Sequence, residues 1–256
     1  MLPIIDTHVH LGTSKFSGVT TTETELLESM ERNGVAASLV MPQPTLANIQ
    51  DIHAQIADLA SRHPGKFYGI ASLDPWMEEE PYVLQLEQCV KEWGFVAAKL
   101  HPMGHNISPL SDRCTKIYET AKRLNIPVIV HTGLGTPFSL PALLIEPARR
   151  FPEVTFVLAH AGFAIYTDEA IVAAKTCENI ILEPSWCQTY TVQKMVSAIG
   201  HQRLIMGSDH VTNLPVEIMK YRSIGLSEEQ LDDIFHHNAK RIFNLNYEGV
   251  TISEGL

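Results

Sequence analysis

The stretch Ile4-Ile5-Asp6-Thr7-His8-Val9-His10 guides the interpretation of the whole chain, because it is a short apolar run that ends in two histidines. Seven further apolar runs follow it, over residues 35–41, 67–73, 95–100, 127–130, 154–159, 180–182 and 204–206. These runs are nearly continuous in apolar residues and do not alternate strictly with polar ones. This is the pattern of parallel strands that are buried on both faces of a sheet.

The segments between the runs have the spacing of amphipathic helices. The first opens with Thr22 and closes at Asn33-Gly34, which are start and stop signals of a helix. We expect helices over residues 22–33, 46–63, 81–93, 112–124, 141–151, 168–176 and 190–199, and closing helices over 227–236 and 238–245. Eight strand–helix alternations predict an α/β protein with a single (β/α)8 TIM-barrel domain over residues 1–256 and extra C-terminal helices. A doubly wound open sheet would also alternate, but it normally places its ligand at one switch point.

Composition restricts the classes of function. The chain has 256 residues, a formal net charge of −10 and 45% hydrophobic residues. The negative charge argues against general binding to nucleic acid or to anionic membranes. The four cysteines form no CxxC pair, and no apolar run approaches the roughly 20 residues of a membrane span. We therefore expect a cytoplasmic protein with reduced thiols.

Residues that can bind a metal recur at the ends of the apolar runs. They are His8, His10, Lys99, His131, His160 and Asp209. The carboxyl ends of barrel strands share one polar mouth, so these side chains are expected to meet there. Residues separated by one position on a strand face the same way, so His8 and His10 together could hold a divalent metal such as Zn²⁺. Asp209 could bind the same ion and take a proton from the activated water.

Each of these residues also has a simpler explanation. His131 and His160 taken singly could be buried core histidines, and Asp209 could be a helix N-cap. The shared position at strand ends favours the functional interpretation. His101 lies two residues after Lys99 and shares its face, so it could contact substrate or support its neighbours.

Residues outside this set are expected to have smaller roles. Glu183 and Trp186 end another strand and could line the same pocket. Five further histidines fall in expected helices or at their ends, where we expect surface or capping positions; they are His53, His63, His201, His236 and His237.

Five motifs together resemble the amidohydrolase superfamily. They are Asp-Thr-His-Val-His (6–10), Val-Ile-Val-His-Thr-Gly (128–133), Leu-Ala-His-Ala-Gly (158–162), Gly-Ser-Asp-His (207–210) and the closing His-Asn-Ala-Lys-Arg-Ile-Phe-Asn-Leu (237–245). They are most similar to the branch of metal-dependent TIM-barrel hydrolases that also contains aminocarboxymuconate-semialdehyde decarboxylase. The resemblance covers residues 4–245 in the order typical of the superfamily.

The resemblance implies a role for each residue. His8, His10, His131 and Asp209 would bind one metal, while His160 would act beside the activated water as an acid–base group together with Asp209. Lys99 and His101 would contact the substrate. If Lys99 were instead carbamylated, it would bridge two metals, and His160 would join the ligands of the second ion. The free lysine and one Zn²⁺ are the favoured form, with Mn²⁺, Fe²⁺ or Co²⁺ as alternatives.

The expected activity is metal-dependent hydrolysis of an amide, lactone or ester bond in a small molecule, which could itself bear a carboxylate. The same site could support a metal-dependent decarboxylation of an unsaturated carboxylic acid. A TatD-type deoxyribonuclease shares the His-x-His start, but it usually carries a glutamate where this chain has Lys99, and the net charge of −10 also argues against it. A ligand-binding barrel without activity would typically have lost some of these residues. We expect no nucleic-acid or membrane partner, and a homodimer.

Overall fold

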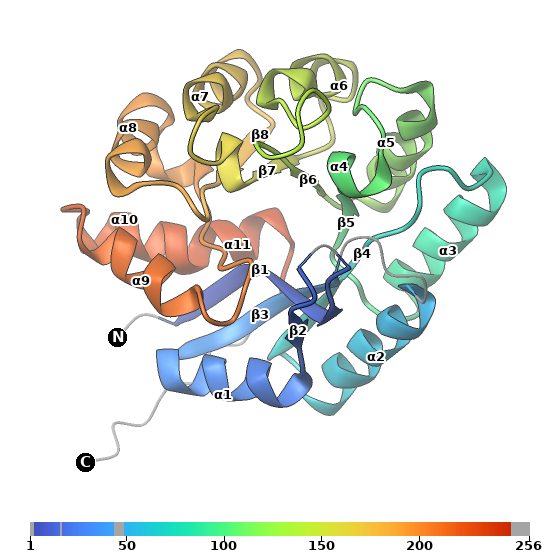
Figure 1. Cartoon of the computed structure of the whole chain (residues 1–256), viewed down its shortest axis with the longest axis horizontal. Helices are drawn as coiled ribbons and strands as arrows, with labels where there is room; N and C mark the ends of the chain where they lie inside the picture. The colour runs from blue at the N-terminus through green and yellow to red at the C-terminus, as the bar shows by residue number, and fades with distance from the viewer. Residues whose placement is uncertain (1–2, 16, 44–48, 247–256) are drawn as a thin grey trace.

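The computed structural model describes residues 3–15, 17–43 and 49–246, and it confirms the predicted barrel. The strands lie in one curled sheet in the order β2-β1-β3-β4-β5-β6-β7-β8, and all neighbours are parallel except β1 and β2. Their bounds are β1 (Ile4–Thr13), β2 (Thr20–Thr21), β3 (Val35–Pro42), β4 (Phe67–Ala71), β5 (Ala97–Leu100), β6 (Val128–His131), β7 (Phe156–Ala159) and β8 (Ile180–Glu183). Figure 1 shows the helices arranged around these strands in chain order.

The eighth barrel segment, residues 204–209, closes the sheet between β8 and β1. Leu204 pairs with Leu182 of β8, and Asp209 pairs with Val9 of β1. The backbone N–H of Thr7 also donates to the Met206 carbonyl at 3.0 Å. The predicted last strand is therefore present as two short parallel bridges rather than as a regular strand.

The helices largely follow the predicted segments. Their bounds are α1 (Glu23–Asn33), α2 (Ile49–Arg62), α3 (Glu79–Lys91), α4 (Pro102–His105), α5 (Asp112–Leu124), α6 (Ile145–Arg150), α7 (Thr167–Thr176), α8 (Thr189–Ile199), α9 (Leu214–Arg222), α10 (Glu228–Asp232) and α11 (Asn238–Ile242). Thr22 and Glu25 form a capping box at the start of α1, and Gly34 ends that helix at φ 65°. Residues 46–48 of the predicted second helix lie outside the described residues. None of the described helices is long and apolar enough to cross a membrane.

One predicted helix changes type along its length, the two predicted closing helices form one continuous helical stretch, and two helices were not expected. Residues 141–150 form a 3₁₀ turn, η1 (Pro141–Leu144), followed by α6, while residues 228–242 pass through α10, the π-helical turn η4 (Asp233–His237) and α11. Sequence reasoning missed the short helix α4 and the longer helix α9, which follows the last barrel segment and carries Pro215 in its first turn. A proline at this position is a start signal that could have revealed it.

The core has two layers. The inner layer fills the barrel with side chains from alternate positions of the strands, for example Ile5, Leu39, Ile129 and Ile205. Phe243, which follows α11, joins the same inner cluster. The outer layer packs the other faces of the strands against the surrounding helices. This packing leaves the carboxyl ends of the strands to form the functional face.

His53 does not lie at the surface, contrary to the sequence-based expectation. It is 1% exposed on α2, and its Nε2 accepts the backbone N–H of Ser72 at 2.9 Å. Because burial disfavours the charged ring, the pKa of His53 is lowered to about 4. Its role is to satisfy a buried backbone donor after β4, a demand that the sequence does not reveal.

Candidate metal centre

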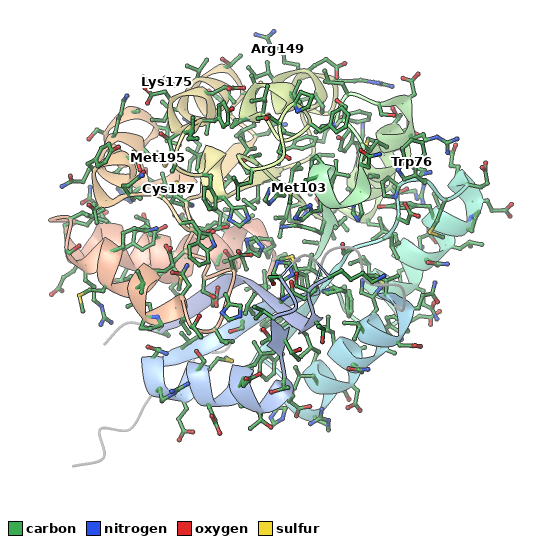
Figure 2. All side chains as sticks on the ribbon, viewed as in Figure 1. Trp76, Met103, Arg149, Lys175, Cys187 and Met195 are labelled. Atoms are coloured by element: carbon green, nitrogen blue, oxygen red, sulfur yellow. The ribbon has the colours of Figure 1, made fainter. Side chains whose placement is uncertain are left out.

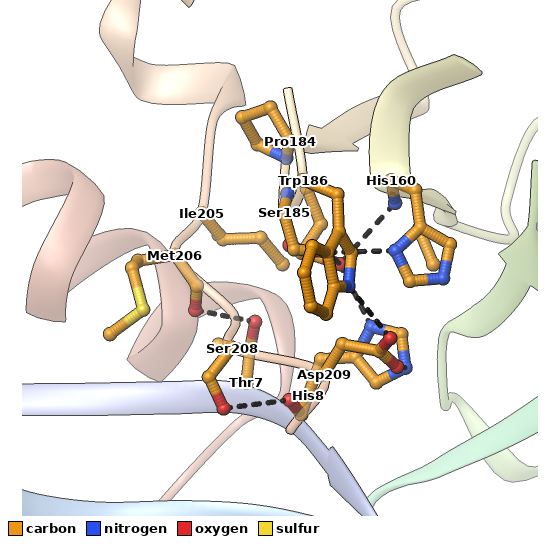
Figure 3. Close-up of polar contacts among 12 residues, drawn as sticks. Thr7, His8, His160, Pro184, Ser185, Trp186, Ile205, Met206, Ser208 and Asp209 are labelled. Carbon is orange, nitrogen blue, oxygen red and sulfur yellow. Dashed lines mark hydrogen bonds and ion pairs between the residues drawn. The ribbon is translucent and has the colours of Figure 1, made fainter. Parts of the chain in front are cut away.

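The six predicted site residues all lie at the carboxyl ends of barrel strands. His8 and His10 belong to β1, Lys99 to β5 and His131 to β6; His160 directly follows β7, and Asp209 ends the eighth segment. Within this set, His8, His10 and Asp209 form a compact group, and His160 lies beside it with its ring centroid 5.0 Å from that of His8. Figure 3 shows how His8, His160 and Asp209 approach one another from three different segments.

The centre of the site is a cluster of electron-pair donors. Asp209 Oδ1 lies 3.3 Å from His8 Nε2 and 3.2 Å from His10 Nε2, and the two Nε2 atoms are 3.2 Å apart. The other ring nitrogen of each histidine faces an acceptor: His8 Nδ1 is 2.8 Å from a Glu183 oxygen, and His10 Nδ1 is 2.8 Å from the Pro42 carbonyl. Each Nδ1 therefore carries the ring hydrogen, and each neutral Nε2 directs a lone pair inward. Two imidazole lone pairs and a carboxylate oxygen fit a divalent metal ion.

Glu183 connects two of the histidines. Its Oε2 accepts from His8 Nδ1 and, at 3.1 Å, from the Ser185 hydroxyl, while His160 Nδ1 is 2.8 Å from that hydroxyl oxygen. The chain of donors then runs from His160 Nδ1–H to Ser185 and from Ser185 to Glu183. His160 consequently presents an unprotonated Nε2. The carboxylate orients both rings, as such partners of metal-binding histidines commonly do.

Asp6 holds the first strand in place through hydrogen bonds to its side chain. Its carboxylate accepts from the backbone N–H and the hydroxyl of Ser208, at 2.9 and 2.6 Å, and from the backbone N–H of His8 at 3.2 Å. Burial raises the pKa of Asp6 to about 7, although these hydrogen bonds act in the opposite direction. Asp6 thus ties β1 to the turn that carries Asp209.

Lys99 is buried within the site, with only 2% of the residue exposed. Its Nζ lies 3.2 Å from His8 Nε2. Burial lowers the pKa of Lys99 to about 8, and the negative charges of Asp209 and Glu183 limit the shift. The amine therefore remains largely protonated at neutral pH.

His131 lies next to the compact group but outside it. Its Nε2 is 2.9 Å from the Leu134 carbonyl, so its Nδ1 holds the free lone pair. Its ring stacks on His101 at 4.2 Å between centroids. His101 Nδ1 accepts the Gly104 N–H at 2.8 Å, which leaves Nε2–H of His101 as a donor. The predicted metal role of His131 and the substrate roles of Lys99 and His101 stay predictions.

The charge states of the site follow from its burial. Burial, followed by the nearby Lys99 charge, holds the pKa of His8 well below its usual range. Burial likewise holds the pKa of His160 well below its usual range. For Asp209, burial raises the pKa, but the surrounding His160, His10 and His8 outweigh it and hold the pKa well below the usual range. At neutral pH burial therefore favours neutral His8 and His160, whereas positive charge within the cluster is what keeps Asp209 ionised.

Backbone strain is concentrated at the same strand ends. His160, Phe163, Trp186 and Asp209 have φ values of 66°, 58°, 64° and 64°, a left-handed conformation that non-glycine residues rarely adopt. Each such residue costs about 1–3 kcal/mol, and strain of this kind clusters at functional sites. The conformation of Asp209 is held by its backbone N–H, which donates to the His8 carbonyl at 2.6 Å.

Large apolar side chains lie around the opening of the barrel. Trp76, Met103, Leu134 and Trp186 follow β4, β5, β6 and β8, and they are 49%, 36%, 51% and 41% exposed. In Figure 2 Met103 lies toward the centre of the ring of helices, whereas Arg149 and Lys175 lie at its outer edge. The mouth therefore combines a polar centre with an apolar rim.

The most important contacts that sequence reasoning missed are those of Glu183, Ser185 and Ser208. Glu183 was expected only to line the pocket, yet it orients two histidines. A signal was available, because a glutamate that ends an apolar strand must be paired once it is buried. The partners are far apart in the chain, since His8 and Glu183 are 175 residues apart, so only the fold reveals the pairing.

Comparison with known proteins places most of the chain in one family. A family model described as amidohydrolase matches residues 5–245. This range includes all six predicted site residues.

Several solved structures have the same fold. A dihydroxybenzoic acid decarboxylase from a Polaromonas species, solved with bound manganese and the inhibitor 2-nitroresorcinol, is 16% identical, with a TM-score of 0.78 over 96% of this chain and 98% of that chain. A 5-carboxyvanillate decarboxylase from Sphingomonas paucimobilis is 14% identical, with a TM-score of 0.75 over 96% of this chain and 100% of that chain. A 4-oxalomesaconate hydratase from Rhodopseudomonas palustris is 21% identical, with a TM-score of 0.70 over 94% of this chain and 95% of that chain.

Proposed function

Because this chain belongs to the amidohydrolase family, we propose that it is a metal-dependent enzyme that hydrolyses an amide, lactone or ester bond in a small molecule. The observation that carries the proposal is the convergence of His8 Nε2, His10 Nε2 and Asp209 Oδ1 within 3.2 to 3.3 Å of one another. These three atoms repel one another unless a cation lies among them. Lys99 Nζ, which is 3.2 Å from His8 Nε2, provides only part of that charge.

His8, His10 and Asp209 would hold the ion, with His131 as a fourth ligand. Zn²⁺ and Mn²⁺ both suit this set of nitrogen and oxygen donors, and the similar decarboxylase from Polaromonas contains manganese. When bound, a divalent ion supplies Lewis acidity toward water and toward a substrate carbonyl.

Two residues can move the proton. Asp209 is ionised, and its Oδ2 accepts the Trp186 indole N–H at 2.8 Å. His160 is neutral and presents an unprotonated Nε2, because its Nδ1 is engaged by Ser185. Either group can accept the proton that water loses as it attacks, and it can return this proton to the leaving group.

Lys99 and His101 would select a substrate with a negatively charged group. The protonated Lys99 adds a positive charge beside the donor cluster, and His101 keeps its Nε2–H as a free donor. A carboxylate or a developing oxyanion is the group that these donors suit.

Decarboxylation of an unsaturated carboxylic acid is the second candidate, and the apolar rim favours it. Met103, Leu134 and Trp186, which are partly exposed after β5, β6 and β8, would surround a flat, apolar ring system held above a polar centre. Two of the similar structures are decarboxylases of aromatic acids. Lys99 would then hold the carboxylate, and Asp209 would relay a proton from water to the carbon that loses CO₂.

A substrate panel distinguishes the two reactions. Lactones, esters and cyclic amides would be followed by acid release or by chromatography, and aromatic and unsaturated carboxylic acids would be followed by CO₂ release, with purified protein and added Zn²⁺ or Mn²⁺. Turnover in the first group supports hydrolysis, and CO₂ release from the second group supports the lyase.

Asp209→Asn tests the mechanism with whichever substrate is found. Proton transfer by a positioned group typically contributes about 10²–10⁴ in rate, so we expect kcat to fall by at least that factor while the thermal unfolding midpoint changes little. The matched control is Asp168→Asn on the exposed surface of α7, which should keep full activity. If Asp209→Asn retains wild-type turnover, the proposed role of Asp209 is wrong.

A further inference from the structure

Trp186 hydrogen-bonds to Asp209, a contact that a residue would not need if it only lined the pocket. It follows β8 in a left-handed conformation with φ 64°, and its indole Nε1–H donates to Asp209 Oδ2 at 2.8 Å. The indole ring also stacks on Phe163, with 6.5 Å between ring centroids and 26° between planes. Figure 3 shows the indole nitrogen directed at the Asp209 carboxylate.

A buried ion pair on α9 holds the backbone of Trp186 in this position. The Trp186 N–H donates to Glu217 Oε1 at 2.8 Å, and Glu217 pairs with Lys220 one turn further along the helix. Lys220 Nζ also donates to the Pro184 carbonyl at 2.8 Å. Glu217 and Lys220 are 2% and 7% exposed, so both ends of the Pro184–Trp186 turn are attached to a buried pair.

The same pair anchors the turn that carries Asp209. Asn213 Nδ2 donates to the Ser208 carbonyl at 2.9 Å and to Glu217 Oε1 at 3.1 Å. The loop after β8 and the loop after the eighth segment therefore share one attachment point. A buried ion pair is weak evidence for added stability, because desolvation offsets the attraction. Its geometry here fixes two loops relative to each other.

We propose that Trp186 is a positioning residue for Asp209, set in place by Glu217 and Lys220. The indole N–H engages Oδ2, so that only Oδ1 faces His8 Nε2 and His10 Nε2, at 3.3 and 3.2 Å. Asp209 would thereby offer a single oxygen, Oδ1, to a metal ion. The contact itself is independent of metal, whereas its consequence for metal binding rests on the proposed function.

The contact can be measured by NMR in protein free of metal. The chain has three tryptophans, Trp76, Trp93 and Trp186, and therefore gives three indole ¹⁵N–¹H signals, which substitution of each tryptophan by phenylalanine would assign. Asp209→Ala removes the acceptor, so we expect the Trp186 signal to move while the Trp93 signal stays in place. Asp168→Ala on exposed α7 should move neither signal. An unmoved Trp186 signal in Asp209→Ala would overturn the proposal.

The consequence for the site can be measured as metal affinity. Trp186→Phe removes the N–H, and we expect Zn²⁺ to bind roughly 10- to 100-fold more weakly, the usual loss when a group that orients a ligand is removed. Trp93→Phe, at the end of α3 and away from the site, is the matched control and should bind like the wild type. If Trp186→Phe does not fold, benzothienylalanine at position 186 keeps the bicyclic shape and lacks the N–H, and the same loss is expected.

The outcomes separate the two proposals. Unchanged Zn²⁺ affinity in a folded protein that lacks the indole N–H overturns the positioning role of Trp186, even if the wild type binds metal well. A wild type that binds no divalent ion overturns the proposed function, while the indole signal still decides whether Trp186 holds Asp209. Weaker binding in Glu217→Gln, accompanied by a shifted Trp186 signal, would support the part assigned to the ion pair.

Discussion

At the scale of single residues, the site is defined by which nitrogen of each histidine carries hydrogen. Glu183 accepts a hydrogen bond from His8 Nδ1, and the Pro42 carbonyl accepts one from His10 Nδ1. Both Nε2 lone pairs therefore point toward Asp209 Oδ1. An arrangement of three acceptors is unfavourable by itself and becomes favourable around a cation. The groups that keep hydrogen on Nδ1 of these histidines therefore matter for metal binding as much as the ligands themselves.

Glu183→Gln tests this point. The amide is similar in shape but neutral, so it no longer stabilises His8 with Nδ1 protonated and Nε2 free. We expect metal affinity to fall roughly 10- to 100-fold, measured by competition with a chelating dye. Glu178→Gln, an exposed change near the opposite end of β8, should leave the affinity unchanged. Equal affinities in the two variants would contradict the role of Glu183.

Sequence reasoning could identify the residues but not their contacts. His8, His10 and Asp209 were predictable because each ends an apolar run, and parallel strands in a barrel end on one face. The hydrogen bonds of Glu183 and Trp186 depend on distances between segments that are far apart in the chain, and no periodicity encodes them.

At the scale of elements, the carboxyl ends of the strands approach one another so closely that side-chain size matters. Gly207, in the eighth segment, lies between His8 and Glu183. A Cβ at this position would come within 2.7 Å of His8 Cβ and 2.9 Å of the Glu183 carboxyl carbon. There is no room for a side chain at this position, because β1, β8 and the last segment converge here.

Gly207→Ala should therefore displace His8 or Glu183. We expect a loss of about 1–3 kcal/mol in the free energy of unfolding, together with weaker metal binding, since overpacking moves the neighbours. Gly34→Ala provides the comparison, because its Cβ would meet nothing within 4 Å at the C-cap of α1. It should lower stability modestly and leave metal affinity unchanged. Normal metal affinity in Gly207→Ala would contradict the close fit.

His53 connects α2 to the end of β4 and should make stability depend on pH. Its folded pKa of about 4 lies below the value of about 6.5 expected in the unfolded chain, so the unfolded state binds more protons between these values. Its neutral form is fully stabilising above pH 6.5, and that stability is lost as the pH falls toward 4.

His53→Gln keeps an acceptor for the Ser72 N–H but does not titrate. Between pH 7 and about 4.5, the wild type should lose about 2–3 kcal/mol more unfolding free energy than His53→Gln, measured by urea titration. Parallel pH profiles for the two proteins would show that His53 is not the titrating group.

At the scale of the whole molecule, the residues that form the barrel core are separate from the residues of the candidate site. Its interior is apolar, with Phe243 and Leu245 joining the inner cluster from the C-terminal segment, whereas the polar residues gather at the carboxyl ends of the strands. The alternation of strands and helices was sufficient to predict this architecture. It was not sufficient to predict α9, whose first turn follows Asp209 closely and whose Glu217 and Lys220 fix the loops of the site.

The central claim is that the strand ends hold a divalent metal, and the most direct test is metal content per chain. It would be measured by elemental mass spectrometry on protein purified without chelators and with added bicarbonate. We expect about one ion of Zn²⁺ or Mn²⁺ per chain, unchanged in Lys99→Met and lost when His8 and His10 are both replaced by alanine. About two ions, falling in Lys99→Met, would replace the single site by a lysine-bridged pair. A content near zero that neither added Zn²⁺ nor added Mn²⁺ raises would contradict the account.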